Sequence, residues 1–318
     1  MPTLLFKPIS CTVEWLVSNI DHGSLGLPDI QRPFVWNNTQ VRDLFDSMFR
    51  GYPVGFLLFW AASANQGSRQ IGSIGHGTDA PSLLIIDGQQ RLTSLYAVMK
   101  GKPVMDKNFA ERPIKIAFHP EKGTFEVHTA ALARSPEWIP NISDLFTQPG
   151  SSRKHINAFL ERLEASQGEV APEREEVIAE NIEQLLNIKG YSFSALEIDK
   201  DTDEELVSDI FVRVNSGGQK LNQSDFILTL MSVFWDEGRD ALETFCKLSR
   251  IPSDHEATPY NYFIKPEPGD MLRVSIGLAF KRARLKYGYQ VLRGKNLETG
   301  EVTAALRESQ FASFKAAQ

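Results

Sequence analysis

One short stretch of the sequence, Ile85 to Thr93, combines residue types that could bind phosphate. An apolar segment leads through Asp87 and Gly88 into Gln-Gln-Arg-Leu-Thr, where apolar residues recur at helical spacing. The free N–H groups and the dipole at a helix start favour anions. Gly88 lets the backbone approach a ligand closely, and Arg91 can make bidentate contacts to phosphate oxygens. The stretch therefore predicts an anion site.

Asp87 would repel a bare phosphate, so its presence needs a separate explanation. A carboxylate beside phosphates commonly binds a divalent cation or orients an attacking water in phosphoryl transfer. Either role implies Mg²⁺ nearby, with Asp87 as its ligand. The structural alternative is a simple turn at Asp87 and Gly88 with Arg91 as a surface ion-pair partner, and the spacing alone leaves this open.

A second stretch, residues 211–221, clusters polar groups between two expected helices. Its pattern is Phe-x-Arg-x-Asn-x-x-Gly-x-x-Leu. Arg213 and Asn215 could face a phosphate or a base. Alternatively, Asn215 and Gly218 serve only to end a helix, with Arg213 in solvent.

A third stretch, residues 28–36, is aromatic and basic and is held extended by two prolines. Arginine with Phe34 and Trp36 nearby suits base stacking and cation–π contact. The aromatic residues could instead only staple the segment to the following helix.

Short strands and helices alternate around these stretches. Asn37 and Asn38 precede a predicted helix as possible caps, and Gly101 is expected to end the helix that follows Asp87. Between residues 142 and 186 the pattern is largely helical, with a solvated connector expected at Glu164–Glu176. The expected helices cover residues 39–50, 92–99 and those following 201, 222 and 269, and the expected strands cover 53–60, 83–86, 114–118, 124–128 and 191–198.

Composition restricts the class of protein. The net charge of −6 argues against a broad basic surface for nucleic acid, although Lys281, Arg282, Arg284, Lys286, Arg293 and Lys295 form one local basic cluster that could meet DNA or a nuclease partner. The two cysteines lack metal-ligand spacing. No secretory signal and no apolar run of membrane-spanning length is present, so we expect a cytoplasmic protein without a membrane partner.

Taken in order, the three stretches resemble the N-terminal domain family of GmrSD-type modification-dependent restriction enzymes. The resemblance rests on three motifs: Gln31-Arg32 before Phe34 and Trp36, the box Asp87 to Arg91, and the motif at residues 211–221. Phe49 to Gly55 also resembles the family's turn before a strand, and the resemblance covers roughly residues 8 to 235. Ile30 and Phe34 stand where members often carry tyrosines, so hydroxyls that could sense modified DNA are missing.

The resemblance implies an α+β fold with a small mixed sheet and helices, similar to ParB and sulfiredoxin. We expect a nucleotide-binding domain at residues 1–230 with a mostly helical insertion at about 140–189. A helical region at 231–318 follows, and its end without a stop signal leaves open whether the chain is a complete subunit or an N-terminal fragment. The box is similar in position to the Gly-x-x-Arg phosphate-binding box of ParB-like CTPases.

These implications define an expected function and site. We expect an NTP-binding, NTP-hydrolysing module of restriction or anti-phage defence that gates a separate HNH-type nuclease domain or subunit and meets modified DNA. The cofactors are Mg²⁺, held by Asp87, and an NTP of unspecified base. The expected catalytic residues are Asp87, Gln89, Gln90 and Arg91, with a glutamine orienting water, and the expected nucleotide-binding residues are Gly88, Arg91, Thr93, Arg213, Asn215, Gly218, Gln31 and Arg32.

Two alternatives remain open at the level of sequence. The same pocket could belong to a noncatalytic module that senses nucleotide or DNA. It could also belong to a ParB-like nuclease that acts on DNA directly, which the acidic balance disfavours. No His-Asn-His arrangement is present, so an HNH centre would have to reside elsewhere.

Overall fold

The chain folds into two compact units, one holding the described residues up to Val207 and one holding those after it. The computed structural model describes residues 5–26, 34–61, 82–106, 110–148, 150–200, 235–253, 257–282, 284–292 and 294–318, with scattered positions between 202 and 231. Because so few positions are described around residue 230, the domain boundary predicted there stays a prediction.

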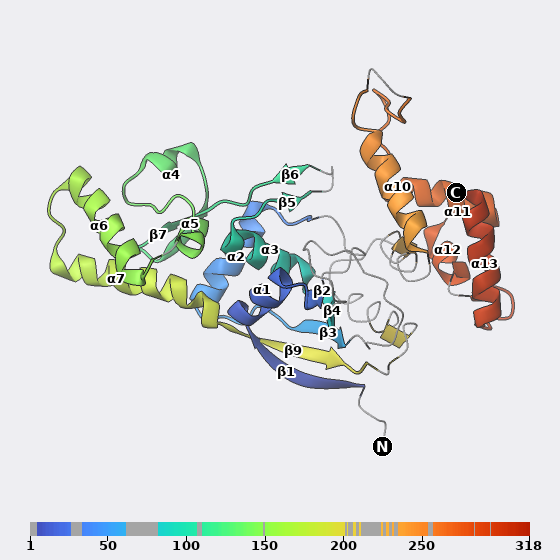
Figure 1. Cartoon of the computed structure of the whole chain (residues 1–318), viewed down its shortest axis with the longest axis horizontal. Coiled ribbons are helices and arrows are strands. Elements are labelled where there is room, and N and C mark those ends of the chain that lie inside the picture. The colour runs from blue at the N-terminus through green and yellow to red at the C-terminus, as the bar shows by residue number, and fades with distance from the viewer. Residues whose placement is uncertain are drawn as a thin grey trace. The chain divides into compact units, whose positions relative to one another are not determined.

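The first unit is built on a five-stranded mixed sheet in the order β1-β9-β3-β4-β2 (Figure 1). β9 pairs antiparallel with β1 and parallel with β3, while β4 pairs antiparallel with β3 and parallel with β2. The last strand of the unit therefore lies between the first and the third. The strands are β1 (Phe6–Thr12), β2 (Leu25–Gly26), β3 (Leu57–Ala61), β4 (Leu83–Asp87) and β9 (Ser192–Ile198).

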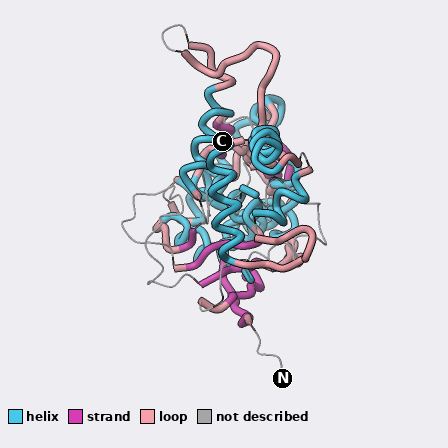
Figure 2. The backbone as a smooth tube through the Cα atoms, turned by 90° about the vertical axis from the view of Figure 1, so that its right-hand side faces the viewer, coloured by secondary structure: helices cyan, strands magenta, loops and turns pink. Residues whose placement is uncertain are grey.

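Three helices of this unit follow local start and stop signals. They are α1 (Val13–Asp21), α2 (Asn38–Phe49) and α3 (Gln89–Lys100), and α1 and α3 lie over one face of the sheet (Figure 1), whose strands are magenta in Figure 2. Asn37 and Gln40 form a capping box at the start of α2. Gly101 ends α3 with a φ of 63°. The predicted Asn37 cap and Gly101 stop are confirmed.

The segment between α3 and β9 forms two hairpins followed by helices. The hairpins are β5 (Val104–Met105) with β6 (Glu111–Arg112), and β7 (Ile116–His119) with β8 (Thr124–Val127). The helices are α4 (Ala130–Arg134), α5 (Ser143–Thr147), α6 (Ser152–Gln167), α7 (Pro172–Leu186) and the 3₁₀ turn η1 (Asn187–Gly190).

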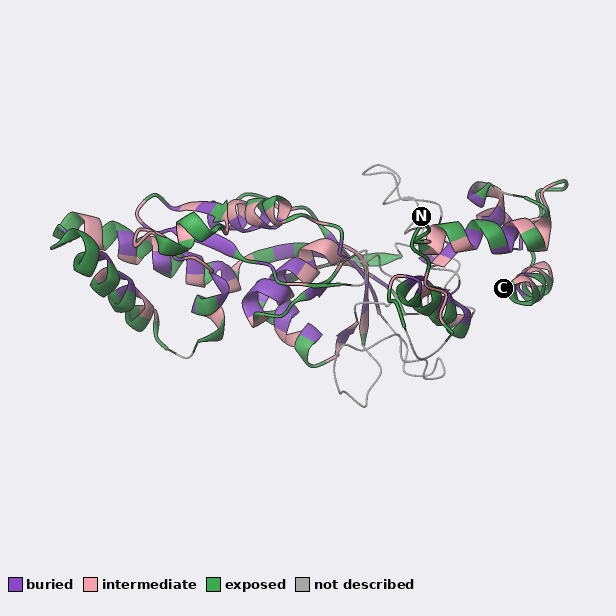
Figure 3. Ribbon diagram, turned by 90° about the horizontal axis from the view of Figure 1, so that it is seen from above, coloured by how far each residue is buried: buried purple, intermediate pink, exposed green. Residues whose placement is uncertain are grey.

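The connector predicted at Glu164–Glu176 is wrong in extent. α6 continues to Gln167 and α7 begins at Pro172, so only four residues connect the two helices. Glu164 of α6 and Glu173 and Glu176 of α7 are exposed, while the opposite faces of the two helices are buried (Figure 3).

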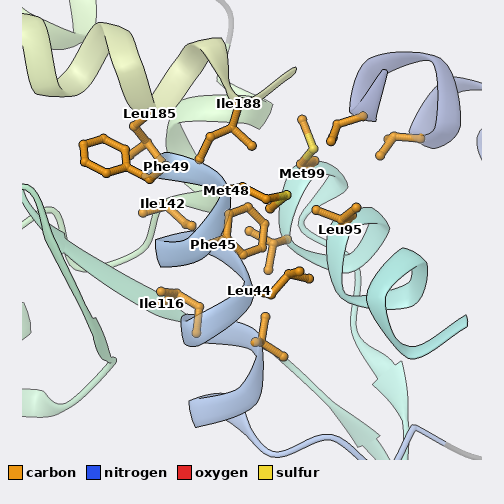
Figure 4. Close-up of a cluster of buried hydrophobic side chains, with 14 of the residues drawn as sticks. Leu44, Phe45, Met48, Phe49, Leu95, Met99, Ile116, Ile142, Leu185 and Ile188 are labelled. Atoms are coloured by element: carbon orange, nitrogen blue, oxygen red, sulfur yellow. The ribbon is translucent and has the colours of Figure 1, made fainter. Parts of the chain in front are cut away.

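One hydrophobic core joins the helical segment to the sheet layer. The α2 side chains Leu44, Phe45, Met48 and Phe49 point toward α3 on one side and toward the hairpin and helical segment on the other (Figure 4). Their partners include Leu95 and Met99 of α3, Ile116 of β7, and Ile142, Leu185 and Ile188. The helical segment is therefore packed into the first unit rather than folded apart from it.

The described part of the second unit is helical. It contains α10 (Asp236–Leu248), α11 (Pro268–Phe280), α12 (Leu285–Leu292) and α13 (Ala304–Ala317). Leu272 and Ile276 of α11 and Phe314 of α13 are completely buried. A small mixed sheet with added helices and a helical C-terminal region confirms the predicted α+β class. Among the described residues, no helix has the length and apolar character needed to cross a bilayer.

Replacing Phe45 with alanine tests whether α2 holds the core together. Phe45 is completely buried, so the Phe45→Ala variant should lose about 3–5 kcal/mol of unfolding free energy, measured by urea denaturation. Val177→Ala on α7 is the control, because Val177 is 41% exposed and should lose less than about 0.5 kcal/mol. Similar losses in the two variants would show that α2 is not central to the core.

Candidate functional site

The candidate site forms where β4 ends and α3 begins. Asp87 is the last residue of β4 and is paired with Leu58 of β3. Gly88 is the N-terminal cap residue of α3, and no side chain caps that helix end. The strand, turn and helix predicted around the Asp87–Arg91 box are confirmed.

Gly88 is required by both backbone conformation and space. Its φ is 101°, in the left-handed region that non-glycine residues rarely adopt. A Cβ atom at this position would overlap the side chain of Leu57 and would lie 3.2 Å from Nη2 of Arg91. The β3 strand therefore passes directly beside the turn.

Arg91 holds that approach of β3 in place. Its Nη1 donates a hydrogen bond to the Val54 carbonyl at 2.7 Å, and its Nη2 donates to the Phe56 carbonyl at 2.7 Å. Nη2 also lies 3.3 Å from Oδ2 of Asp87. Gly55, between the two carbonyls, has a φ of 88°, and a Cβ there would lie 2.6 Å from Nη1. The guanidinium thus fills the turn before β3.

These contacts give Arg91 a role that the sequence did not predict. Arg91 was expected from sequence to bind phosphate. Its guanidinium instead donates to two backbone carbonyls and lies beside the Asp87 carboxylate, and the Arg91 side chain is only 15% exposed. Burial lowers the pKa of Arg91, and the Asp87 carboxylate acts in the opposite direction. Arginine stays charged in proteins, so a buried positive charge remains beside the start of α3.

Gln90 links the box to the third sequence motif. Its Oε1 accepts hydrogen bonds from the backbone N–H of Val35 at 3.0 Å and of Trp36 at 3.3 Å. Two stretches more than 50 residues apart are therefore joined by one side chain. The sequence predicted two separate motifs, because the spacing within each motif does not indicate a contact between them.

Arg112 of β6 also contacts this region, and the sequence did not single it out. Its Nη2 donates to the Trp36 carbonyl at 2.7 Å, its Nη1 donates to Asn38 at 3.1 Å, and its guanidinium lies 5.5 Å from the centre of the Phe34 ring. Gln90 and Arg112 together fix the backbone of residues 34–38. No local pattern marks Arg112, since its partners lie about 75 residues away.

The remaining predicted site residues divide into two groups. Gln89 and Thr93 lie one turn apart on α3, and both are partly buried. Gln31, Arg32, Arg213, Asn215 and Gly218 lie outside the described residues. Their expected contribution to a nucleotide pocket stays a prediction.

The donor groups at the junction suit an anion with a loosely held cation. The first turn of a helix presents backbone N–H groups without intrahelical acceptors. Asp87 has a side chain that is 35% exposed, and Arg91 contacts only its Oδ2. Within the described ranges, no group of three or more His, Cys, Asp or Glu residues is placed to hold a metal. Mg²⁺ needs no such cage, because it keeps waters and binds through one or two carboxylates and substrate phosphates.

Comparison with known proteins agrees with the motif resemblance. The family model described as the N-terminal domain of GmrSD restriction endonuclease matches residues 13–232, more than two thirds of the chain. An uncharacterized protein of Methanocaldococcus jannaschii is 33% identical over 91 residues, which is 26% of this chain and 15% of that protein. The chain therefore spans only a small part of the length of this curated relative.

Gly88→Ala tests the close packing of the junction, with Gly51→Ala as a matched control. Both glycines have positive φ, but a Cβ at Gly51 would meet nothing within 4 Å. Gly51→Ala should therefore lose only the backbone cost of about 1–2 kcal/mol. Gly88→Ala should lose roughly 1–3 kcal/mol more because of the overlap with Leu57. Equal losses in urea denaturation would contradict the packing described here.

Proposed function

We infer that this chain, which belongs to the family of GmrSD restriction endonuclease N-terminal domains, binds a nucleoside triphosphate with Mg²⁺ and regulates DNA restriction. The observation that carries the proposal is the α3 start: a helix N-terminus without a side-chain cap that directly follows a partly exposed carboxylate at the end of β4. Hydrolysis of the nucleotide is the expected reaction.

The first turn of α3 supplies the phosphate-binding groups. Its backbone N–H groups and helix dipole attract an anion, and the absence of a side chain at Gly88 lets Leu57 of β3 pack directly against this helix start. The buried charge of Arg91 adds to the positive potential without itself needing to leave the Val54 and Phe56 carbonyls.

Asp87 would hold Mg²⁺, which neutralises phosphate charge when bound. Its position beside the helix start explains how a carboxylate can lie next to an anion site. Gln89 is the better candidate to orient an attacking water, because Oε1 of Gln90 is already engaged by the amides of Val35 and Trp36. The catalytic set expected from sequence thus divides into Asp87 and Gln89 at the ligand and Gln90 and Arg91 as positioning residues.

The same contacts offer a route by which nucleotide could alter the surrounding chain. A shift of the α3 start would displace the turn at Val54–Phe56 through the hydrogen bonds of Arg91. It would also displace the segment at residues 34–38 through the hydrogen bonds of Gln90. A nuclease centre in another domain or subunit would be the target of this change, and modified DNA would be its substrate.

A noncatalytic nucleotide sensor is the second candidate. The observation in its favour is that the Arg91 guanidinium is engaged by protein acceptors, which leaves less of it to stabilise charge in a transition state. Binding of nucleotide without phosphate release would select this candidate. Cleavage of plasmid DNA by this chain alone would instead select a ParB-like nuclease.

Titration of ATP, GTP, CTP and UTP, each with Mg²⁺, tests the proposal. At least one should raise the melting temperature and release phosphate, with about 2.7 kcal/mol of stabilisation at 100 times the Kd. Asp87→Ala should abolish phosphate release and spare part of the binding, because it removes the metal ligand. Arg91→Ala should weaken binding and lose roughly 1–3 kcal/mol of stability, because the Val54 and Phe56 carbonyls lose their donor.

The Asp46–Arg50 pair of α2 provides matched controls. It is also an Asp–Arg pair four residues apart, with Nε and Oδ2 at 2.9 Å, and the Arg50 side chain is 41% exposed. Asp46→Ala and Arg50→Ala should leave nucleotide binding and phosphate release unchanged. Phosphate release that persists unchanged in both Asp87→Ala and Arg91→Ala would remove the site from the α3 junction.

A further inference from the structure

His119 is a buried histidine that the candidate site does not use. It is the last residue of β7, and it is only 1% exposed. Its ring meets the ring of Trp138 edge to face at 5.1 Å. Imidazole is the side chain whose charge ordinarily changes between about pH 5 and pH 8. A titratable group is therefore packed between β7 and the segment of residues 135–142.

The two ring nitrogens of His119 have different surroundings. Nδ1 accepts a long hydrogen bond, 3.4 Å, from the backbone N–H of Lys122 in the turn between β7 and β8. A nitrogen that accepts carries no proton, so the neutral ring carries its proton on Nε2. Nε2 is buried without a hydrogen-bond partner among the described residues, and Oε2 of Glu137 lies 3.8 Å from it. The neutral ring thus fits the turn, whereas a proton on Nδ1 would face the Lys122 N–H.

A series of polar contacts leads away from His119 and returns to the same turn. Oε1 of Glu137 accepts from Nε2 of Gln167, the last residue of α6, at 3.0 Å. Arg174 of α7 lies 3.4 Å from Oε1 of Gln167 and donates to Oε2 of Glu121 at 2.8 Å. Glu121 lies two residues after His119. The histidine is therefore beside the contacts that connect the hairpin, the 135–142 segment and the facing ends of α6 and α7.

The groups around His119 disfavour a second proton on its ring. Burial lowers the pKa of His119 most, and Lys122 of the turn and Arg174 of α7 act in the same direction. Glu137 and Glu121 act in the opposite direction without reversing the shift. The hydrogen bond from Arg174 lowers the pKa of Glu121, so this carboxylate stays charged where histidine titrates. The folded chain therefore takes up a proton on this ring less readily than the unfolded chain.

We propose that His119 makes a pH-sensitive contact between β7 and the 135–142 segment: the neutral ring holds the two together, and a proton on the ring loosens them. An imidazolium ion loses the Lys122 contact and is costly to bury, so it favours an arrangement in which the Trp138 side of the ring opens to water. This inference does not depend on the nucleotide site at α3.

The backbone bridge beside the ring is the contact that such an opening breaks. The amides of Phe118 and Ile139 donate to each other's carbonyls at 2.9 and 2.8 Å. Above about pH 6.5 the ring is neutral whether the bridge is closed or open, and the contact is fully present. As the pH falls below this value, the open state takes up the proton first, and the loss continues down to the lowered pKa of the closed state. One proton limits the loss to about tenfold per pH unit.

Hydrogen exchange of the Phe118 and Ile139 amides in the full chain tests this contact. Between about pH 7.5 and pH 5.5, their protection, corrected for the intrinsic exchange rates, should fall about 3- to 10-fold. The amides of β1 that pair with β9 should keep their protection, because His119 is remote from that pairing in the fold. An equal fall in β1 would show global unfolding and would overturn the proposal, as would unchanged protection at Phe118 and Ile139.

Two histidine variants assign the effect to one ring. His119→Gln cannot take up the proton and should abolish the fall in protection, whereas His22→Gln, which removes an exposed histidine, should retain it. A fall that persists in His119→Gln would overturn the proposal. A measurement on the unaltered chain covers the case in which His119→Gln does not fold. The NMR signal of the His119 ring should titrate below about pH 6.5, and titration at or above that value would contradict the contact.

Discussion

The candidate site depends on the hydrogen bonds from Arg91 to the Val54 and Phe56 carbonyls. They bring the turn before β3 against the start of α3, and a buried guanidinium needs such acceptors because a charge without partners is costly to bury. Two glycines make the approach possible, since a Cβ at Gly55 would collide with Arg91 and a Cβ at Gly88 would collide with Leu57. The box from Asp87 to Arg91 therefore connects the start of α3 to the turn before β3, and it is also the candidate ligand site.

Two polar side chains connect the segment at residues 34–38 to α3 and to β6. Gln90 accepts from the Val35 and Trp36 amides, and Arg112 donates to the Trp36 carbonyl from β6. Three backbone groups of the segment are therefore hydrogen-bonded to side chains from two other parts of the chain. This arrangement makes the α3 start a point where a bound ligand could be sensed by several segments at once.

Charge is divided unequally along the chain. Residues 1–207 contain 27 acidic and 19 basic residues, whereas residues 208–318 contain 13 acidic and 15 basic residues. The chain is acidic overall, but residues 257–295, which include α11 and α12, contain eight basic and two acidic residues. The acidic excess that disfavours nucleic-acid binding lies in residues 1–207, whereas residues 208–318 carry a small basic excess.

The sequence alone determined the short-range features, because helix caps, glycine stops and apolar spacing act over a few residues. The Asn37 cap, the Gly101 stop and the strand–turn–helix around Asp87 were predictable in this way. β1 was not predicted, because its pairing with β9 joins Ser10 to Ser192, and Pro8 weakens the local strand signal. Tertiary structure alone decided that Arg91 faces backbone carbonyls, that Gln90 holds Val35 and Trp36, and that Arg112 joins them. These contacts connect residues 35 to 76 positions apart, which spacing within one motif cannot specify.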